Sequence, residues 1–142
     1  MRKIAQIEVI VRAIILNQGK ILLCKMKGAD YYFLPGGHVE FGENTETALV
    51  REVKEEFNGK VKSHKLFGTH ENVYRKRGRN RHEINFVYQV KLKSYRVASV
   101  ESHIDFEWKK IKDLKAAKIV PSGLKAKLLL SGILKKDSHV IS

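Results

Sequence analysis

The sequence contains a single cysteine among its 142 residues, so no disulfide can form within the chain. Cys24 ends an apolar run, Ile-Leu-Leu-Cys, and this setting predicts a buried, unreactive side chain. The sequence also lacks an apolar stretch long enough to span a bilayer. Near the N-terminus, Glu8 and Arg12 interrupt the apolar residues, which argues against a signal peptide. These absences predict a cytoplasmic protein with no membrane partner.

Acidic residues are scarce: 15 Asp plus Glu stand against 28 Lys plus Arg, for a formal net charge of +13. Such a surface attracts polyanions, so we expect a phosphate-rich partner, although a need for solubility explains the excess equally well. The apolar share of 43% is too high for a disordered chain. The length suits one domain, residues 1–142, with a core that needs no disulfide or structural metal.

Alternation of apolar and polar residues predicts several strands. The strand over residues 7–16 is apolar on both alternating sides, which predicts cover on both of its faces. Asn17-Gln18-Gly19 is a turn signal that would join this strand to the next as a hairpin. Pro35-Gly36-Gly37, in contrast, is expected to stop regular structure. The predicted strands cover residues 7–16, 20–25, 60–73, 82–92 and 106–111.

Residues 45–57 contain no proline or glycine, and their apolar side chains recur at helical spacing, so they are predicted to form a helix. Asn44 is suited to cap its start, and Asn58 to end it in the left-handed conformation. A second helix is predicted over residues 121–134, and residues 135–142 are expected to fray. This order of elements predicts an α/β fold with helices on both faces of a mixed sheet.

Three glutamates of the first predicted helix, Glu52, Glu55 and Glu56, fall on one arc at the edge of its apolar face. Like charges at this spacing cost a few tenths of a kcal/mol per pair in an isolated helix. A divalent cation would remove that conflict, and magnesium prefers oxygen ligands of this kind. The alternative is a solvated helix face on which Arg51 and Lys54 neutralise the acids.

The spacing of Gly37, Glu43 and the run Arg51-Glu52-Val53-Lys54-Glu55-Glu56 resembles the Nudix box, G-x5-E-x7-R-E-U-x-E-E-x-G-U, of the MutT-like Nudix hydrolases. The box would cover residues 37–59. The preceding segment 34–37, Leu-Pro-Gly-Gly, and the later Trp108 before Leu114 are also similar to members of this family. The resemblance implies an α/β/α sandwich and magnesium-dependent hydrolysis of a diphosphate linkage in a nucleoside diphosphate joined to another moiety.

One departure from the box lies at its end, where Asn58-Gly59 replaces glycine and an apolar residue. We expect Asn58 to keep the capping function and the missing apolar side chain to weaken local packing.

The resemblance also implies a role for each matched position. Magnesium, with manganese as a substitute, would be bound by Glu52, Glu55 and Glu56 and by the carbonyl of Gly36, where glycine permits close approach. Glu43 and Arg51 would orient this shell. The general base stays open between a box glutamate, with Glu55 or Glu56 as first choice, and Glu101 outside the box.

The segment 74–81 carries five basic residues beside Tyr74 and is expected to be a loop at a hairpin tip. It would reach the phosphates or the base of a substrate, or simply be a solvated tip. His38, His70 and His82 flank the site and are expected to be structural or exposed.

Three functions remain open. The first is hydrolysis of a small nucleotide: a nucleoside triphosphate, a nucleotide sugar or a dinucleotide. The second is removal of pyrophosphate from RNA 5′ ends, which the net charge favours. The third is a non-catalytic nucleotide-sensing module, against which the complete glutamate set argues. A monomer and a homodimer are both compatible with the sequence.

Overall fold

The computed structural model describes residues 6–138, whose strands form two sheets. The larger sheet has the order β4 (Gly36–His38), β1 (Glu8–Ile14), β6 (Arg79–Leu92) and β5 (Val61–Lys76). In it β1 runs parallel to β6, while β4 pairs with β1 and β5 with β6 in antiparallel fashion, so this sheet is mixed. The smaller sheet is antiparallel and has the order β2 (Leu16–Asn17), β3 (Lys20–Met26) and β7 (Ile104–Lys110).

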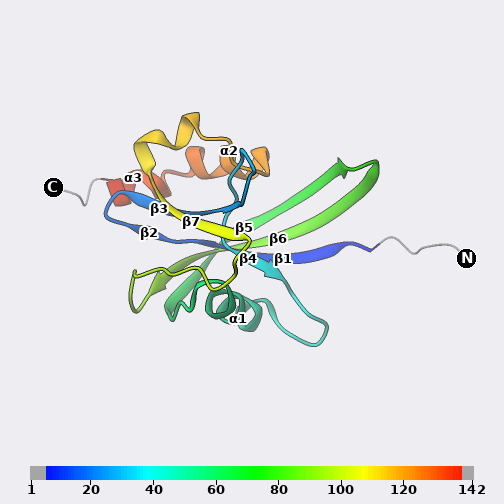
Figure 1. Ribbon diagram of the computed structural model, residues 1–142, viewed down its shortest axis with the longest axis horizontal. Coiled ribbons are helices and arrows are strands. Elements are labelled where there is room, and N and C mark those ends of the chain that lie inside the picture. Colours follow the sequence, from blue (N-terminus) through cyan, green and yellow to red (C-terminus); the bar gives the residue numbers. More distant parts are fainter. Residues whose placement is uncertain (1–5, 139–142) are drawn as a thin grey trace, which may run out of the picture.

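Helices lie on both sides of the strands, as the sequence predicts (Figure 1). Helix α1 (Thr45–Phe57) covers one side. The 3-10 helix η1 (Ile111–Ala116), α2 (Ser122–Ser131) and α3 (Ile133–Ser138) lie on the other. This is the α/β/α arrangement predicted above, with the strands divided between two sheets. Among the residues described, no helix has the length and apolar character needed to cross a membrane.

Two apolar cores fill the layers on either side of β1. Val11, Ala13 and Ile15 point toward α1 and pack with its Leu49 and Val53. On the opposite face, Ile14 packs with residues of α2 and α3, including Leu124, Leu128 and Leu134. Burying such a side chain contributes about 1.5–3 kcal/mol, so β1 is anchored from both sides. The prediction of a strand covered on both faces is therefore confirmed, and Cys24 is fully buried as expected.

Helix α1 has the boundaries and caps that the sequence predicts. The Asn44 side chain accepts a hydrogen bond of 2.8 Å from the Thr47 amide, and Asn58 is left-handed with φ 56°. The expectation of weakened packing after it is wrong, because Gly59 is buried. A side chain there would overlap Phe57 and Val53, which already fill the space.

Three segments differ from the predicted elements. Gly36 to His38 pair with β1 as strand β4, although Pro35-Gly36-Gly37 was expected to stop regular structure. Gly132, with φ 79°, divides the single helix predicted over residues 121–134 into α2 and α3. Residues 135–138, expected to fray, belong to α3, and the rest of the predicted tail lies outside the described residues.

The segment 74–81, predicted to be a loop, is instead the end of a long hairpin. β5 and β6 continue to a two-residue turn at Arg77 and Gly78, with φ values of 51° and 73°. Two successive positive φ angles match the right-handed twist of a two-stranded ribbon. The outer part of this hairpin, residues 72–83, projects away from the helices and is called the arm below (Figure 1).

Candidate active site

The acid cluster, Glu52, Glu55 and Glu56, lies where α1 packs against strand β4. Glu56 is buried, and its Oε1 accepts a hydrogen bond of 2.8 Å from the Gly36 amide. A side chain at Gly37 would come within 2.5 Å of the Glu52 carboxylate. Gly36 has φ 146°, and a side chain there would overlap the Val11 carbonyl. The two glycines are therefore required so that β4 can approach both β1 and the cluster.

Arg51 is the hub that fixes the acids around it. Its Nε and Nη2 donate to the two carboxylate oxygens of Glu43 at 2.8 Å each, a bidentate pair. Nη1 donates to Glu52 at 3.0 Å and to Glu55 at 3.2 Å. Nη2 also reaches the carbonyl of His38 at 3.0 Å, which ties the end of β4 to α1. Arg51 thus links Glu43, Glu52 and Glu55 to the end of β4.

The carboxylates differ in their proton affinity because they differ in surroundings. Hydrogen bonds from Arg51 lower the pKa of Glu43 to about 2. Burial raises the pKa of Glu56 to about 8, and the neighbouring charges of Glu52 and Glu101 add to this rise. Burial also raises the pKa of Glu52. Two of the three clustered acids therefore carry their negative charge at a cost when no cation is near.

This donor set fits a hard divalent cation. Three carboxylates share one and a half turns of a helix, and the two less exposed ones are the ones whose charged form burial disfavours. Within residues 6–138, no three acidic, His or Cys side chains converge on a point as they stand. Arg51 draws Glu52 and Glu55 to itself, and the Gly36 amide holds Glu56. A cation would neutralise the negative charge that remains on the three glutamates after their contacts with Arg51.

Glu101, the acid expected outside the box, lies next to the cluster. It precedes β7, and the amide of its neighbour Val100 donates to the backbone carbonyl of Glu56 at 3.1 Å. The Glu101 charge raises the pKa of both Glu52 and Glu56, which places it within electrostatic range of both. Its own carboxylate forms an ion pair with His103 at 3.3 Å.

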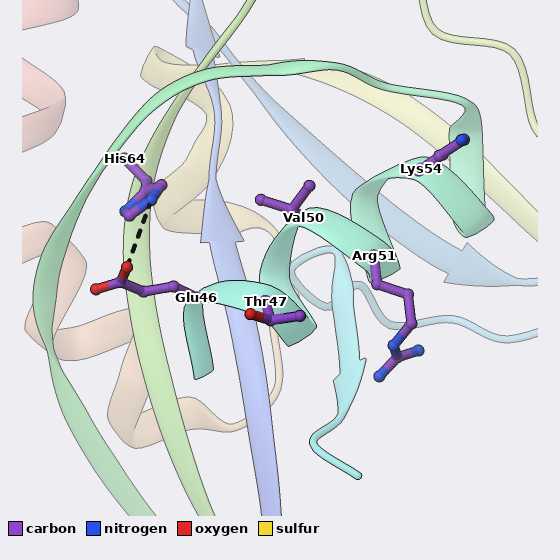
Figure 2. A pocket seen from close by; sticks show the side chains of 6 residues that line it. All are labelled: Glu46, Thr47, Val50, Arg51, Lys54 and His64. Atoms are coloured by element: carbon purple, nitrogen blue, oxygen red, sulfur yellow. Dashed lines mark ion pairs between the residues drawn. The ribbon is translucent and has the colours of Figure 1, made fainter. Parts of the chain in front are cut away.

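The outer side of α1 forms a separate shallow hollow (Figure 2). In Figure 2 the side chains of His64 and Glu46 face each other at one end, as an ion pair of 4.0 Å. The Arg51 side chain extends away from that pair. The residues lining the hollow are Glu46, Thr47, Val50, Arg51, Lys54 and His64. The hollow shares Arg51 with the acidic site, but none of Glu52, Glu55 and Glu56 lines it.

Arg12 belongs to the site but was not singled out from the sequence. Its Nη1 donates to the Leu34 carbonyl at 3.0 Å, and its guanidinium lies 5.7 Å from the centre of the Phe33 ring. Its charge partly offsets the rise in the pKa of Glu56. A signal was present, since Arg12 is the one charge inside the apolar run of residues 9–16.

A second polar group, of which the sequence analysis names only His70, lies on the face of the larger sheet that α2 covers. His70, Glu83 and Asn85 are all buried there. Asn85 donates to the His70 carbonyl at 3.2 Å and to Glu83 at 3.3 Å. His70 Nδ1 and Asn85 Oδ1 have no hydrogen-bond partner among the described residues. Buried atoms of this kind commonly bind a ligand group or an ordered water.

The side chains of the other two histidines pair with nearby acids outside the cluster. His38 is 3.4 Å from Glu8, and His82 is 2.7 Å from Glu71. These contacts agree with the structural or exposed role expected for them.

A comparison with family models matches residues 6–129 to the NUDIX domain. The chain belongs to the Nudix family. Solved Nudix structures share the fold: a MutT NUDIX hydrolase from Burkholderia pseudomallei has a TM-score of 0.73 and 26% identity, over 86% of this chain and 97% of that one. The NUDIX domain of NrtR from Shewanella oneidensis, solved with ADP ribose, has a TM-score of 0.68 and 19% identity, over 89% and 90%.

Sequence similarity extends to an ADP-ribose pyrophosphatase from Methanocaldococcus jannaschii. The two chains are 51% identical over 51 residues, which are 34% of this chain. The matched segment spans 30% of the length of that relative.

Proposed function

We propose that this Nudix protein is a divalent-metal-dependent pyrophosphohydrolase that cleaves a diphosphate linkage in a nucleoside diphosphate joined to another moiety. The observation that carries the proposal is the position of Glu52 and Glu56 against the Gly36-Gly37 segment, with Arg51 fixing the neighbouring acids. All the charged positions of the Nudix box are present, and those from Arg51 to Glu56 lie on one folded helix, which supports the proposal over a charged surface that matches a pattern by chance.

In this proposal the cation is magnesium, or manganese in its place, held by Glu52, Glu55, Glu56 and the Gly36 carbonyl. When bound, it would neutralise diphosphate charge and lower the pKa of a nearby water. Arg51 and Glu43 would keep the cluster in position through their bidentate pair.

Glu56 is our first candidate for the general base. Its Oε1 is occupied by the Gly36 amide, which orients the carboxylate and leaves Oε2 to accept a proton from water. Water would attack one phosphorus atom of the linkage, the bridging P–O bond would break, and two phosphate products would leave. Glu55, which is exposed, and Glu101, beside the cluster, are the remaining candidates.

ADP-ribose is the first substrate to test, because the M. jannaschii relative that shares the 51-residue segment is an ADP-ribose pyrophosphatase. Nucleoside triphosphates, nucleotide sugars and dinucleotides complete the set of small substrates.

The test is a screen of these compounds with magnesium, read by 31P NMR so that the position of cleavage is seen. We expect cleavage of at least one diphosphate linkage, dependent on the cation and lost in Glu56→Gln. Glu55→Gln and Glu101→Gln, assayed beside it, identify the base as the position with the largest loss of kcat. Failure of the wild-type protein to cleave any such linkage with magnesium or manganese would overturn the proposal.

A second candidate function, pyrophosphate removal from RNA 5′ ends, is favoured by the net charge of +13. A non-catalytic sensing module is disfavoured by the complete acid cluster. We further propose that residues 1–142 act as one domain in the cytoplasm, as a monomer or a homodimer.

A further inference from the structure

We propose that one face of the arm binds the phosphate backbone of a single-stranded nucleic acid. The register of the hairpin places Lys76 opposite Arg79, and Tyr74 opposite Arg81. Side chains directly opposite each other in an antiparallel pair lie on the same face, and successive pairs alternate. These two pairs are separated by one other pair, so all four side chains share one face. With Arg77 in the turn, the four cations line a common hollow: Lys76, Arg77, Arg79 and Arg81.

The positive charge on this basic face is not compensated by the protein. Within the described residues, none of its four cations forms an ion pair or a side-chain hydrogen bond, and all are exposed. The nearest acid on the same face is Glu83, which is buried at the base of the arm. The opposite face differs, since Arg75 donates to the Gly78 carbonyl and His82 pairs with Glu71. Four of the five Lys and Arg residues of the arm thus line one hollow, where their side chains are exposed.

The arm lies too far from the acid cluster for one small nucleotide to contact both. Arg12 pairs with Gly36 on one side and Val87 on the other. From Val87, six residues along β6 lead to Arg81 and eight to Arg79. At about 3.3 Å per residue, with two strand spacings of about 4.8 Å, the basic face lies roughly 20–30 Å from Gly36.

A stacked strand advances about 3.4 Å per nucleotide, so this distance corresponds to roughly six to nine nucleotides. Closely spaced arginines and lysines on an exposed ribbon suit repeated phosphates, which a strand supplies. Tyr74 lies among them, half-buried at its root, and offers a ring on which an unpaired base can stack. A single strand presents both features, so we assign it rather than a duplex or an anionic membrane.

The test measures binding of a fluorescent oligouridine of about 20 nucleotides by anisotropy across a range of salt concentrations. EDTA is present throughout, so the result is independent of whether the protein hydrolyses anything. The arm variant is Lys76→Ala with Arg79→Ala and Arg81→Ala. Its control is Lys60→Ala with Lys91→Ala and Lys93→Ala, which removes three exposed charges from the other end of the same hairpin. Circular dichroism verifies that each variant is folded.

We expect the arm variant to lose at least about tenfold in affinity, with a salt slope shallower by about 2, because each phosphate contact on a single strand contributes about 0.7. The control should stay within about twofold to threefold of wild type. Tyr74→Ala should weaken binding roughly tenfold with an unchanged slope, and Tyr74→Phe should restore it.

Three results would overturn the proposal. The wild-type protein could fail to bind the oligonucleotide at low salt. The arm and control variants could weaken binding equally, which would assign the effect to net charge alone. A duplex, or vesicles containing phosphatidylserine, could bind more tightly than the single strand and depend on the same three cations.

Discussion

The acid cluster on α1 and the basic face of the arm are both dense groups of like charge, but contacts hold only the first in place. Arg51 and the Gly36 amide bind the carboxylates at 2.8–3.2 Å, and the apolar core between β1 and α1 packs behind them. The four cations of the basic face are exposed at the end of a two-stranded ribbon, and they form no ion pair or side-chain hydrogen bond with any described residue. Rigid, partly desolvated charge suits chemistry, whereas mobile, solvated charge suits attraction of a flexible polyanion.

The largest effect should come from the centre of the acid cluster. We expect Glu56→Gln to lower kcat at least about a thousandfold, because it removes the negative charge of a carboxylate proposed both to hold the cation and to accept a proton. Steady-state hydrolysis of the best substrate measures this. Glu46→Gln is the matched control, since Glu46 is exposed on the same helix outside the cluster. Equal rates for the two variants would remove Glu56 from the mechanism.

The second largest effect on activity should come from replacing Arg51, which holds the acid cluster together. Arg51→Lys keeps the charge but loses the bidentate pair with Glu43, so we expect activity to fall about 10- to 100-fold. The magnesium concentration needed for half-maximal activity should rise with it. Lys54→Arg is the control, since Lys54 lies about one turn further along the same helix, and this variant should behave like wild type. An unchanged magnesium requirement in Arg51→Lys would show that the pair does not position the cluster.

Close approach of β4 to the cluster can be tested by adding one methyl group. In Gly37→Ala the new carbon meets the Glu52 carboxylate, so we expect about tenfold lower activity and a stability loss of about 1–3 kcal/mol. Gly68→Ala is the control, because a side chain there meets nothing within 4 Å. Urea denaturation and the hydrolysis assay together measure both effects, and equal behaviour of the two variants would contradict the model of tight packing.

A smaller effect concerns the stability of the metal-free protein. The pKa of Glu56 is about 8 in the folded state against an ordinary 4.5, so between these pH values the folded protein holds a proton that the unfolded chain has released. Stability in EDTA should therefore fall as the pH rises from about 5 to 8, by at most roughly 1.4 kcal/mol per pH unit. Glu56→Gln should flatten this dependence. Urea denaturation at each pH measures the free energy of unfolding. An equal pH dependence of this free energy in the wild type and the variant would contradict the prediction.

The smallest expected effect tests whether the basic face of the arm contributes to hydrolysis of a small substrate at the acid cluster. Removing Lys76, Arg79 and Arg81, three of the four cations of the basic face, should change kcat/KM for a small diphosphate substrate by less than about twofold, because the arm lies roughly 20–30 Å from Gly36. The same hydrolysis assay measures it. A loss of tenfold or more would mean that the arm folds back onto the small-molecule site.

Local signals in the sequence were sufficient for α1, for its caps and for the family, because each depends on residues within a short segment. Pairing between distant segments was not visible: β4 exists only because β1 lies beside Gly36 to His38. The polar residues of the arm predict a loop, because a strand that is solvated on both faces shows no alternation of apolar and polar residues. Gly59 shows the same limit, since neighbours, not composition, decide how well a position is packed.

Within the site, spacing predicted which acids would meet but not what would hold them. The contact of Arg51 with four different groups, the place of Arg12, and the buried His70 and Asn85 depend on tertiary packing. The adjacency of Glu101 depends on how the segment before β7 meets the end of α1.

Calorimetric titration of manganese into the wild-type protein and into the double variant Glu52→Gln with Glu56→Gln addresses the metal site directly. Saturable binding to the wild-type protein and its loss in a variant that melts no lower would agree with these carboxylates serving to hold a divalent cation. Identical binding isotherms for the two proteins, or no binding to either, would contradict it.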